Sequence, residues 1–191
     1  MRILFVCILT GLLASCGQNT NNGLTADPSG SEYPMGARRE AYEGIPGLEK
    51  VYVRGNDGIR EEGDYYKGKK HGSWTEYYKT GPVGKVTTYF QGIKQGIYLE
   101  FDDRGAVTTK AYYHNGVYEG EFISYKRGRV IEKRTYSGGQ LNGTKQTFYD
   151  NGKPQEESNY VNGKIDGIAK YYNQQGELLF EYEYKDGQLV Q

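Results

Sequence analysis

Glycines recur through most of this chain at an almost constant spacing. One series lies 24, 24, 23 and 24 residues apart: Gly72, Gly96, Gly120, Gly143 and Gly167. Two further series follow it at fixed distances, and a looser first copy begins near Gly47. A repeat of this length is one small supersecondary unit that buries its apolar side chains only against its neighbours. The sequence therefore predicts a repeat protein of about six copies, and this periodicity outranks local propensity in choosing a fold.

Aromatic residues keep the same register as the glycines, and we call them the ladder residues. They are Tyr65, Tyr77, Tyr89, Phe101, Tyr113, Tyr125, Tyr136, Phe148, Tyr160, Tyr172 and Tyr184. Between turn signals such as Asn115-Gly116 lie segments of six to eight residues, which are too short for helices and rich in Tyr, Thr and Val. Each copy is therefore predicted to be a β-hairpin. Even spacing, as between Val107 and Tyr113, predicts one aromatic face and one mostly charged face.

The repeated phrases "GKKHGSWTEYYKTG" and "NGKIDGIAKYYNQQG" resemble the MORN-repeat-variant family. The resemblance extends over residues 47–191, which we take as the repeat domain. It implies an all-β fold, an elongated single-layer antiparallel sheet of stacked β-hairpin repeats. Copy four, residues 120–142, lacks one residue in its first turn ("YKRG" against "FDDRG"), and we expect a shorter loop there with an intact strand ladder.

The same resemblance carries expectations about function. MORN-type repeats are usually interpreted as protein-interaction scaffolds, and some were proposed to bind membrane lipids. Bacterial members of the variant family are often labelled antitoxin components of toxin–antitoxin systems. An exported protein would lie in a different compartment from a cytoplasmic antitoxin, so an exported immunity protein is the form of that function that fits this chain.

The N-terminal residues have the pattern of a targeting segment. An apolar run after Met1-Arg2 is too short to span a bilayer and ends in Leu13-Ala14-Ser15-Cys16, which resembles a bacterial lipobox. We therefore expect residues 1–15 to be a lipoprotein signal peptide, and residues 16–46 to comprise a lipidated Cys16 and a flexible linker. The alternative is an ordinary secretory signal. The expected location is the bacterial cell envelope, with membrane anchoring by lipid at the outer membrane.

Composition and residue inventory argue against several functional classes. The 24 basic and 24 acidic residues balance, so the sequence does not indicate nucleic-acid binding. The other cysteine, Cys7, lies in the expected signal peptide, and the two histidines, His71 and His114, belong to different copies. Neither a catalytic set nor metal-ligand spacing is apparent. The sequence therefore predicts no enzyme, no cofactor and no metal site.

Three aromatic residues outside the ladder are candidates for a binding site. Trp74, Tyr98 and Phe122 occupy one equivalent position in consecutive copies, where Lys145 and Ala169 stand in the later ones. Their odd offset from Tyr77, Phe101 and Tyr125 predicts that they project from the opposite face of the sheet. An exposed stripe of this kind suits a partner interface, and a locally covered second core is the alternative. The expected partner is an envelope protein. Alternatives are a glycan or cell-wall polymer stacked on aromatic rings, or a toxin.

Overall fold

The computed structural model describes residues 24–26 and 32–190, which form two antiparallel sheets and no helix. The small sheet pairs β1 (Leu24–Ala26) with β2 (Glu32–Pro34). The large sheet has 16 strands, of which 14 follow one another along its length. Besides β18 (Gln188–Leu189), these are β3 (Ala37–Ala41), β4 (Leu48–Gly55), β5 (Gly58–Tyr66), β6 (Lys69–Tyr77), β7 (Val83–Phe90), β8 (Ile93–Phe101), β9 (Val107–His114), β11 (Gly120–Lys126), β12 (Arg129–Ser137), β13 (Gln140–Phe148), β14 (Pro154–Val161), β16 (Gly167–Tyr172) and β17 (Leu178–Lys185). Short strands β10 (Val117–Tyr118), β15 (Lys164–Ile165) and β18 (Gln188–Leu189) complete the hairpins.

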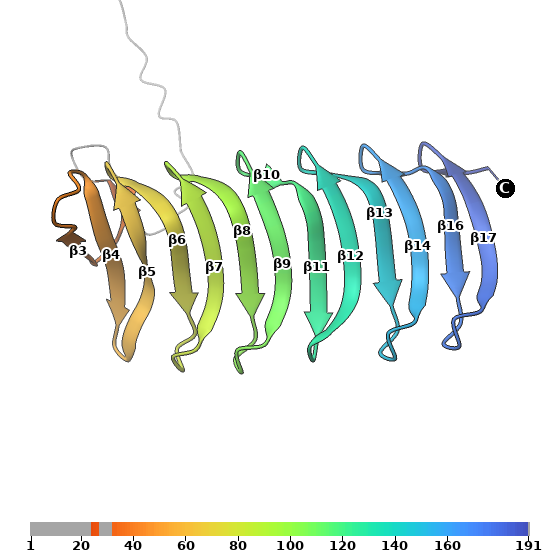
Figure 1. Cartoon of the computed structure of the whole chain (residues 1–191), viewed down its shortest axis with the longest axis horizontal. Helices are drawn as coiled ribbons and strands as arrows, with labels where there is room; N and C mark the ends of the chain where they lie inside the picture. Colours follow the sequence, from red (N-terminus) through yellow and green to blue (C-terminus); the bar gives the residue numbers. More distant parts are fainter. Residues whose placement is uncertain (1–23, 27–31, 191) are drawn as a thin grey trace, which may run out of the picture.

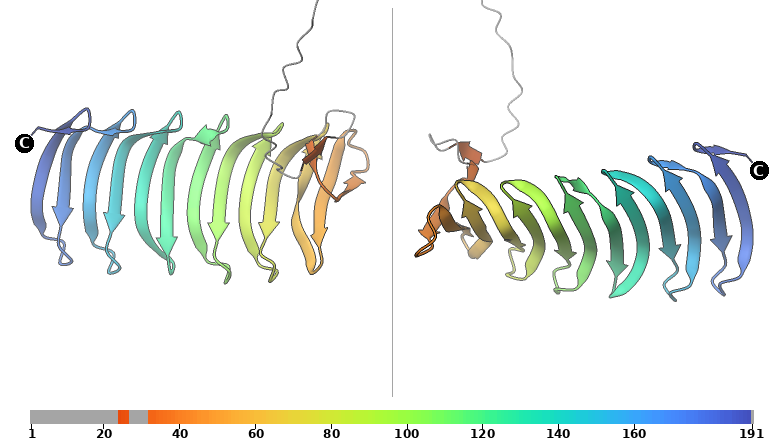
Figure 2. Two further views of the ribbon diagram at one scale, coloured as in Figure 1. Left: turned by 180° about the vertical axis from the view of Figure 1, so that it is seen from behind. Right: turned by 45° about the horizontal axis from the view of Figure 1, so that its top comes forward.

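Hairpins follow one another along a single elongated layer, with β3 at one end and β17, paired with the short β18, at the other (Figures 1 and 2). The predicted all-β class and the stacked-hairpin sheet are therefore confirmed. The large sheet already begins at Ala37, within the segment for which the sequence indicated a flexible linker, because β3 pairs along its whole length with β4. Among the described residues, no helix is long and apolar enough to cross a bilayer.

From the β5–β6 turn onward, the upper turns in Figure 1 share one conformation that the sequence dictates. Each has positive φ at both central residues, as at Asn115 (φ 50°) and Gly116 (φ 85°). This is the two-residue type I′ geometry whose twist matches that of paired strands, and Asn and Gly tolerate it best. The lower turns are mostly longer. In copy four the lower turn is also a two-residue one, with Arg127 and Gly128 between the paired residues Lys126 and Arg129, as the missing residue predicted.

A β-bulge recurs near the lower end of each hairpin and changes which face the side chains occupy. Tyr77 pairs with Val83 whereas Glu76 pairs with Lys85, so Gly84 is an extra residue. The same shift separates Phe101–Val107 from Glu100–Thr109. Because one inserted residue reverses the alternation of side chains, Val107 and Tyr113 lie on opposite faces despite their even spacing. The prediction of one aromatic face and one mostly charged face is therefore wrong: both faces carry aromatic residues.

We name the two faces after residues that lie on them. The Trp74 face holds one continuous central row, because residues paired across neighbouring strands point to the same side. Its members are Val51, Gly63, Trp74, Thr87, Tyr98, Ala111, Phe122, Arg134, Lys145, Ser158, Ala169 and Tyr182. The Glu62 face is the opposite side, and its central row runs from Glu62 through Lys133 to Glu157.

Side-chain burial is concentrated in the central row of the Trp74 face. Val51, Trp74, Thr87, Ala111 and Ala169 are at most 1% exposed. The tightest cluster joins Val51 and Trp74 to Tyr65, which stacks on Tyr33 from β2 at 4.7 Å between ring centroids. From Val51 to Phe122 large side chains alternate with small ones along the row and lie over them, so the large sheet forms a core whose added cover, at Tyr65, comes from Tyr33.

Candidate functional site

The predicted aromatic stripe is part of the core of the Trp74 face. Trp74 is 1% and Tyr98 is 8% exposed, and Phe122 is half-buried. The expectation of an exposed stripe is therefore corrected at Trp74 and Tyr98, and the alternative of a second covered core describes them. They do lie on the face opposite Tyr77, as their odd offset predicted.

The burial has a physical cause in the neighbouring rows. Lys70 lies over the rings of Trp74 and Tyr89 at 4.1 and 5.2 Å from their centroids, and Lys94 repeats this arrangement in the next copy. Such cation–π contacts let an ammonium group cover aromatic surface. Burial lowers the pKa of Lys70. In copy four Tyr118 takes the place of the lysine, with its ring against Phe122 and Tyr136.

Carboxylates accept hydrogen bonds from the polar side chains in the central row of the Trp74 face, or form ion pairs with them. Trp74 donates its indole N–H to Glu61 at 3.2 Å, and Tyr98 donates its hydroxyl to Glu100. Further along the row, Arg134 pairs with Glu132, and Lys145 with Glu156. Buried donors need hydrogen-bond partners, so these acidic residues have a structural role. They also balance the positive charges of Arg134 and Lys145 in the central row.

The ladder residues divide into two sets on opposite faces. Those that precede the upper turns lie on the Trp74 face, where Tyr65 is buried and Tyr89, Tyr113, Tyr136, Tyr160 and Tyr184 are half-buried. Those that precede the lower turns lie on the Glu62 face and are all half-buried: Tyr77, Phe101, Tyr125, Phe148 and Tyr172. Each of the latter pairs with an aliphatic residue or proline, such as Val83 or Pro154. Sequence reasoning found the ladder residues and missed the bulge, which places Val83 with Tyr77 on the Glu62 face and away from Tyr89.

A second pattern on the Glu62 face links two of these lower ladder residues to the central row. Tyr77 donates its hydroxyl to Glu62 at 2.6 Å, and Tyr172 donates to Glu157 at 3.0 Å. The hydrogen bond to Glu62 raises the pKa of Tyr77 to about 12. In copy four, Lys133 and Phe148 hold the two equivalent positions, with neither a carboxylate nor a hydroxyl. The pair of residues at these positions varies along the chain, and the hydrogen bond forms in the two copies that have Glu with Tyr. The other pairs are Val86–Phe101, Lys110–Tyr125 and Lys133–Phe148.

We expect the Glu62–Tyr77 hydrogen bond to make stability depend on pH. The hydrogen bond from Tyr77 holds the pKa of Glu62 below its usual 4.5, and an ion pair with Lys50, with 3.2 Å between Nζ and Oε2, acts in the same direction. A carboxyl group with a lowered folded-state pKa stabilises above its unfolded pKa and loses this effect as pH falls through the folded value. Urea unfolding at pH 7 should therefore find Glu62→Gln less stable than the parent protein, and the difference should shrink at pH 3.

Glu43→Gln, which changes an exposed carboxylate in a turn, serves as the control and should show no such trend. Equal destabilisation of Glu62→Gln at both pH values would contradict the assigned role of this carboxylate.

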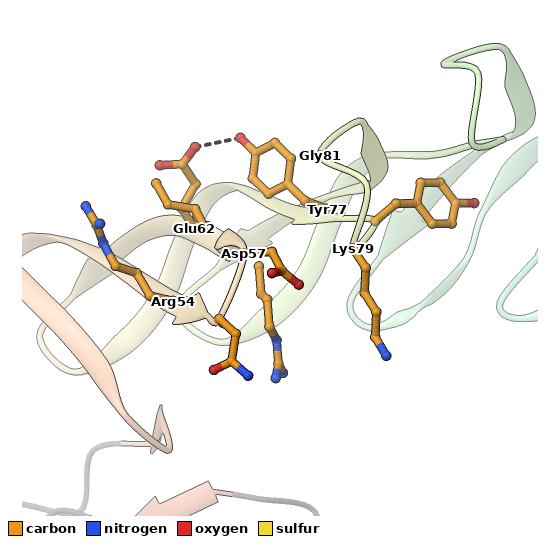
Figure 3. Close-up of a pocket in the computed structure, with 12 residues that line it drawn as sticks. Arg54, Asp57, Glu62, Tyr77, Lys79 and Gly81 are labelled. Atoms are coloured by element: carbon orange, nitrogen blue, oxygen red, sulfur yellow. Dashed lines mark hydrogen bonds between the residues drawn. The ribbon is translucent and has the colours of Figure 1, made fainter.

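Two pockets open at the lower edge of the sheet in equivalent places of different copies. The first has a volume of about 670 Å³ and includes Ile59, Glu62, Tyr77 and Lys79 (Figure 3). The second, of about 490 Å³, is lined by Arg129, Val130, Lys133, Phe148, Asn151 and Gly152. Register equates Ile59 with Val130 and Tyr77 with Phe148. The first pocket thus contains a hydrogen-bonded carboxylate where the second contains a lysine.

The histidines take part in local structure. His71 lies between the rings of Tyr66 and Phe90, at 5.7 and 5.5 Å between centroids. His114 Nδ1 is 3.0 Å from the side-chain nitrogen of Gln95. Within residues 24–26 and 32–190, no group of three or more His, Cys, Asp or Glu is placed to hold a metal ion. Cys16 and the expected signal peptide, residues 1–15, lie outside the described residues.

Comparison with known proteins bears on the C-terminal copies directly. The search of curated proteins gave no match to the chain. The family model of the MORN repeat variant matches residues 141–162 and 165–186. These matches span β13 to β17 and coincide with two copies of the structural repeat. Together with the common register of the other copies, the match supports assignment of the repeats to the MORN-repeat family.

Proposed function

We propose that the protein is a lipid-anchored binding scaffold of the bacterial envelope that holds another protein on its repeat sheet, without catalysis of its own. The observation that carries the proposal is the one-layer sheet: its two faces both display aromatic and charged side chains in register over many copies. An extended surface of this kind suits a macromolecular partner. The match to a family of binding repeats supports the same function.

Crosslinking in intact envelopes followed by capture of the protein tests this function. The expected result is a defined protein partner that is absent when an unrelated lipoprotein is captured in parallel. Recovery of a sugar polymer without protein would contradict this function and favour glycan binding. Recovery of a toxin would favour the function of an immunity protein.

Glycan binding is a second candidate because of an aromatic cluster on the Trp74 face. Tyr171, Phe180 and Tyr182 lie 5.0 to 6.3 Å apart between ring centroids, and Phe180 and Tyr182 are 47% and 40% exposed. Exposed rings of this kind offer apolar faces to a sugar or a peptide.

Membrane attachment is expected to depend on Cys16. The lipobox-like Leu13-Ala14-Ser15-Cys16 provides the motif for lipidation. Cys16→Ser should therefore move the protein from the membrane fraction to the soluble fraction after cell disruption, as measured by immunoblotting. Ser15→Ala, which keeps a small residue before the cysteine, is the matched control and should stay with the membranes. Membrane retention of Cys16→Ser would refute the lipid anchor.

A further inference from the structure

The pocket of copy four differs in charge from its counterpart in copy one. It lies on the Glu62 face at the lower edge of the β11–β12 hairpin and has a volume of about 490 Å³. Arg129 and Lys133 line it, and none of the described residues that line it is acidic. In the counterpart, Asp57 and Glu62 accompany the basic residues (Figure 3). The same place in the repeat therefore changes from mixed charge to positive charge.

The positive charges of this pocket have few internal partners. Lys133 has neither an ion pair nor a hydrogen bond among the described residues. Arg129 donates to the backbone carbonyl of Asp150 and forms no ion pair within the part of the chain that the structure describes, although Asp150 lines a neighbouring hollow with it. Lys126 is 3.8 Å from the exposed Asp150 carboxylate. The hairpin of residues 120–137 carries five basic and two acidic residues in a chain with no net charge.

Part of the pocket lining is apolar. Val130 and Phe148 line the pocket together with the two cations, and Asn151 adds an amide. Phe148 has no hydroxyl, whereas Tyr77 and Tyr172 at equivalent positions use theirs to bind a carboxylate of the sheet. The pocket thus offers an apolar surface next to charges that no carboxylate of the sheet satisfies. A ligand that fits it has an apolar group adjacent to one or more anionic groups.

We infer that this pocket binds an acidic segment of a partner protein, with a large apolar side chain on Val130 and Phe148 and flanking carboxylates at Arg129 and Lys133. The inference rests on the proposed function and adds the chemistry of the partner. A peptide satisfies both halves of the pocket, because Asp or Glu next to Leu or Phe places charge and apolar surface a few ångströms apart. Charge complementarity is what selects this occupant.

The experiment uses a synthetic, fluorescein-labelled peptide, Gly-Glu-Glu-Leu-Phe-Glu-Glu-Gly, titrated with the protein while fluorescence anisotropy is recorded. Two companion peptides replace either the four glutamates by Gln or the Leu-Phe pair by Ser-Ser. The key variant is Lys133→Glu/Phe148→Tyr, which rebuilds the Glu–Tyr pair that Glu157 and Tyr172 already form in the sheet. It is therefore compatible with the fold, and circular dichroism checks this. Lys164→Glu, an exposed charge near an upper turn, is the matched control.

The acidic peptide should bind the parent protein and the Lys164→Glu control equally, and the Lys133→Glu/Phe148→Tyr variant at least about tenfold more weakly. Binding should weaken as salt is raised, because exposed charges are screened, and either companion peptide should bind about tenfold more weakly. Equal binding by the key variant, or none by the parent protein, overturns the inference. So does preferential binding to phosphatidylglycerol vesicles through the same residues, since the occupant would then be a lipid headgroup.

Envelope capture separates this inference from the proposed function. If the parent protein and the key variant capture the same protein equally, the pocket is not the interface and the scaffold function stands. If neither captures a protein and the peptide does not bind, both fail.

Discussion

Replacing Trp74 by Ala is expected to lower the free energy of unfolding by about 3–5 kcal/mol, the usual loss on truncating a large buried aromatic side chain. Trp74 is 1% exposed, and its ring packs edge-on against that of Tyr65, with 5.6 Å between the ring centroids. The ammonium group of Lys70 covers the indole ring, and the indole N–H donates a hydrogen bond to Glu61. Its removal would leave a cavity that a single-layer sheet has no second layer to fill. Thermal and urea unfolding of the purified protein measure the effect.

Val161→Ala is a suitable control, because Val161 is 48% exposed. Its effect should stay below about 1 kcal/mol. If the two variants unfold alike, Trp74 contributes little to the core and its role in binding must be reconsidered.

Gly63→Ala is expected to destabilise by about 1–3 kcal/mol, the cost of overpacking a tight core. A Cβ at Gly63 would be 2.3 Å from Cε3 of Trp74 and 2.8 Å from the carbonyl oxygen of Ser73. The indole ring lies directly over this glycine, so even one methyl group displaces it. Gly84→Ala is the matched control, and it should cost less. The three heavy atoms nearest to its Cβ all belong to the ring of Tyr78, which is 40% exposed, and the nearest of them is 3.2 Å away.

The two substitutions should not be additive. In a Trp74→Ala background the ring is gone, and Gly63→Ala should cost markedly less than in the parent protein. A double-mutant cycle by urea unfolding measures this coupling. Additive effects would show that the clash with Ser73 backbone, rather than the indole ring, sets the requirement for glycine at position 63.

The sequence by itself determined the repeat, the turns and the class of fold. Glycine at fixed spacing, preceded by Asn or Asp as at Asn115 and Asp186, requires positive-φ turns, and the short Tyr-rich segments between them form strands. These are local properties, so they are readable from one chain. The match of residues 141–162 and 165–186 to the MORN repeat variant reflects the same local pattern.

Only the tertiary structure decided which side chains share a face. One extra residue, such as Gly84, reverses the alternation along β7, so Val83 joins Tyr77 on one side of the sheet while Tyr89 lies on the other. The bulge depends on pairing between strands, and a count along one strand does not reveal it. For the same reason the sequence predicted that Trp74 would be exposed. The lysine that covers it, Lys70, is brought over the ring by the irregular pairing of β5 with β6, and its hydrogen-bond acceptor, Glu61, lies on β5.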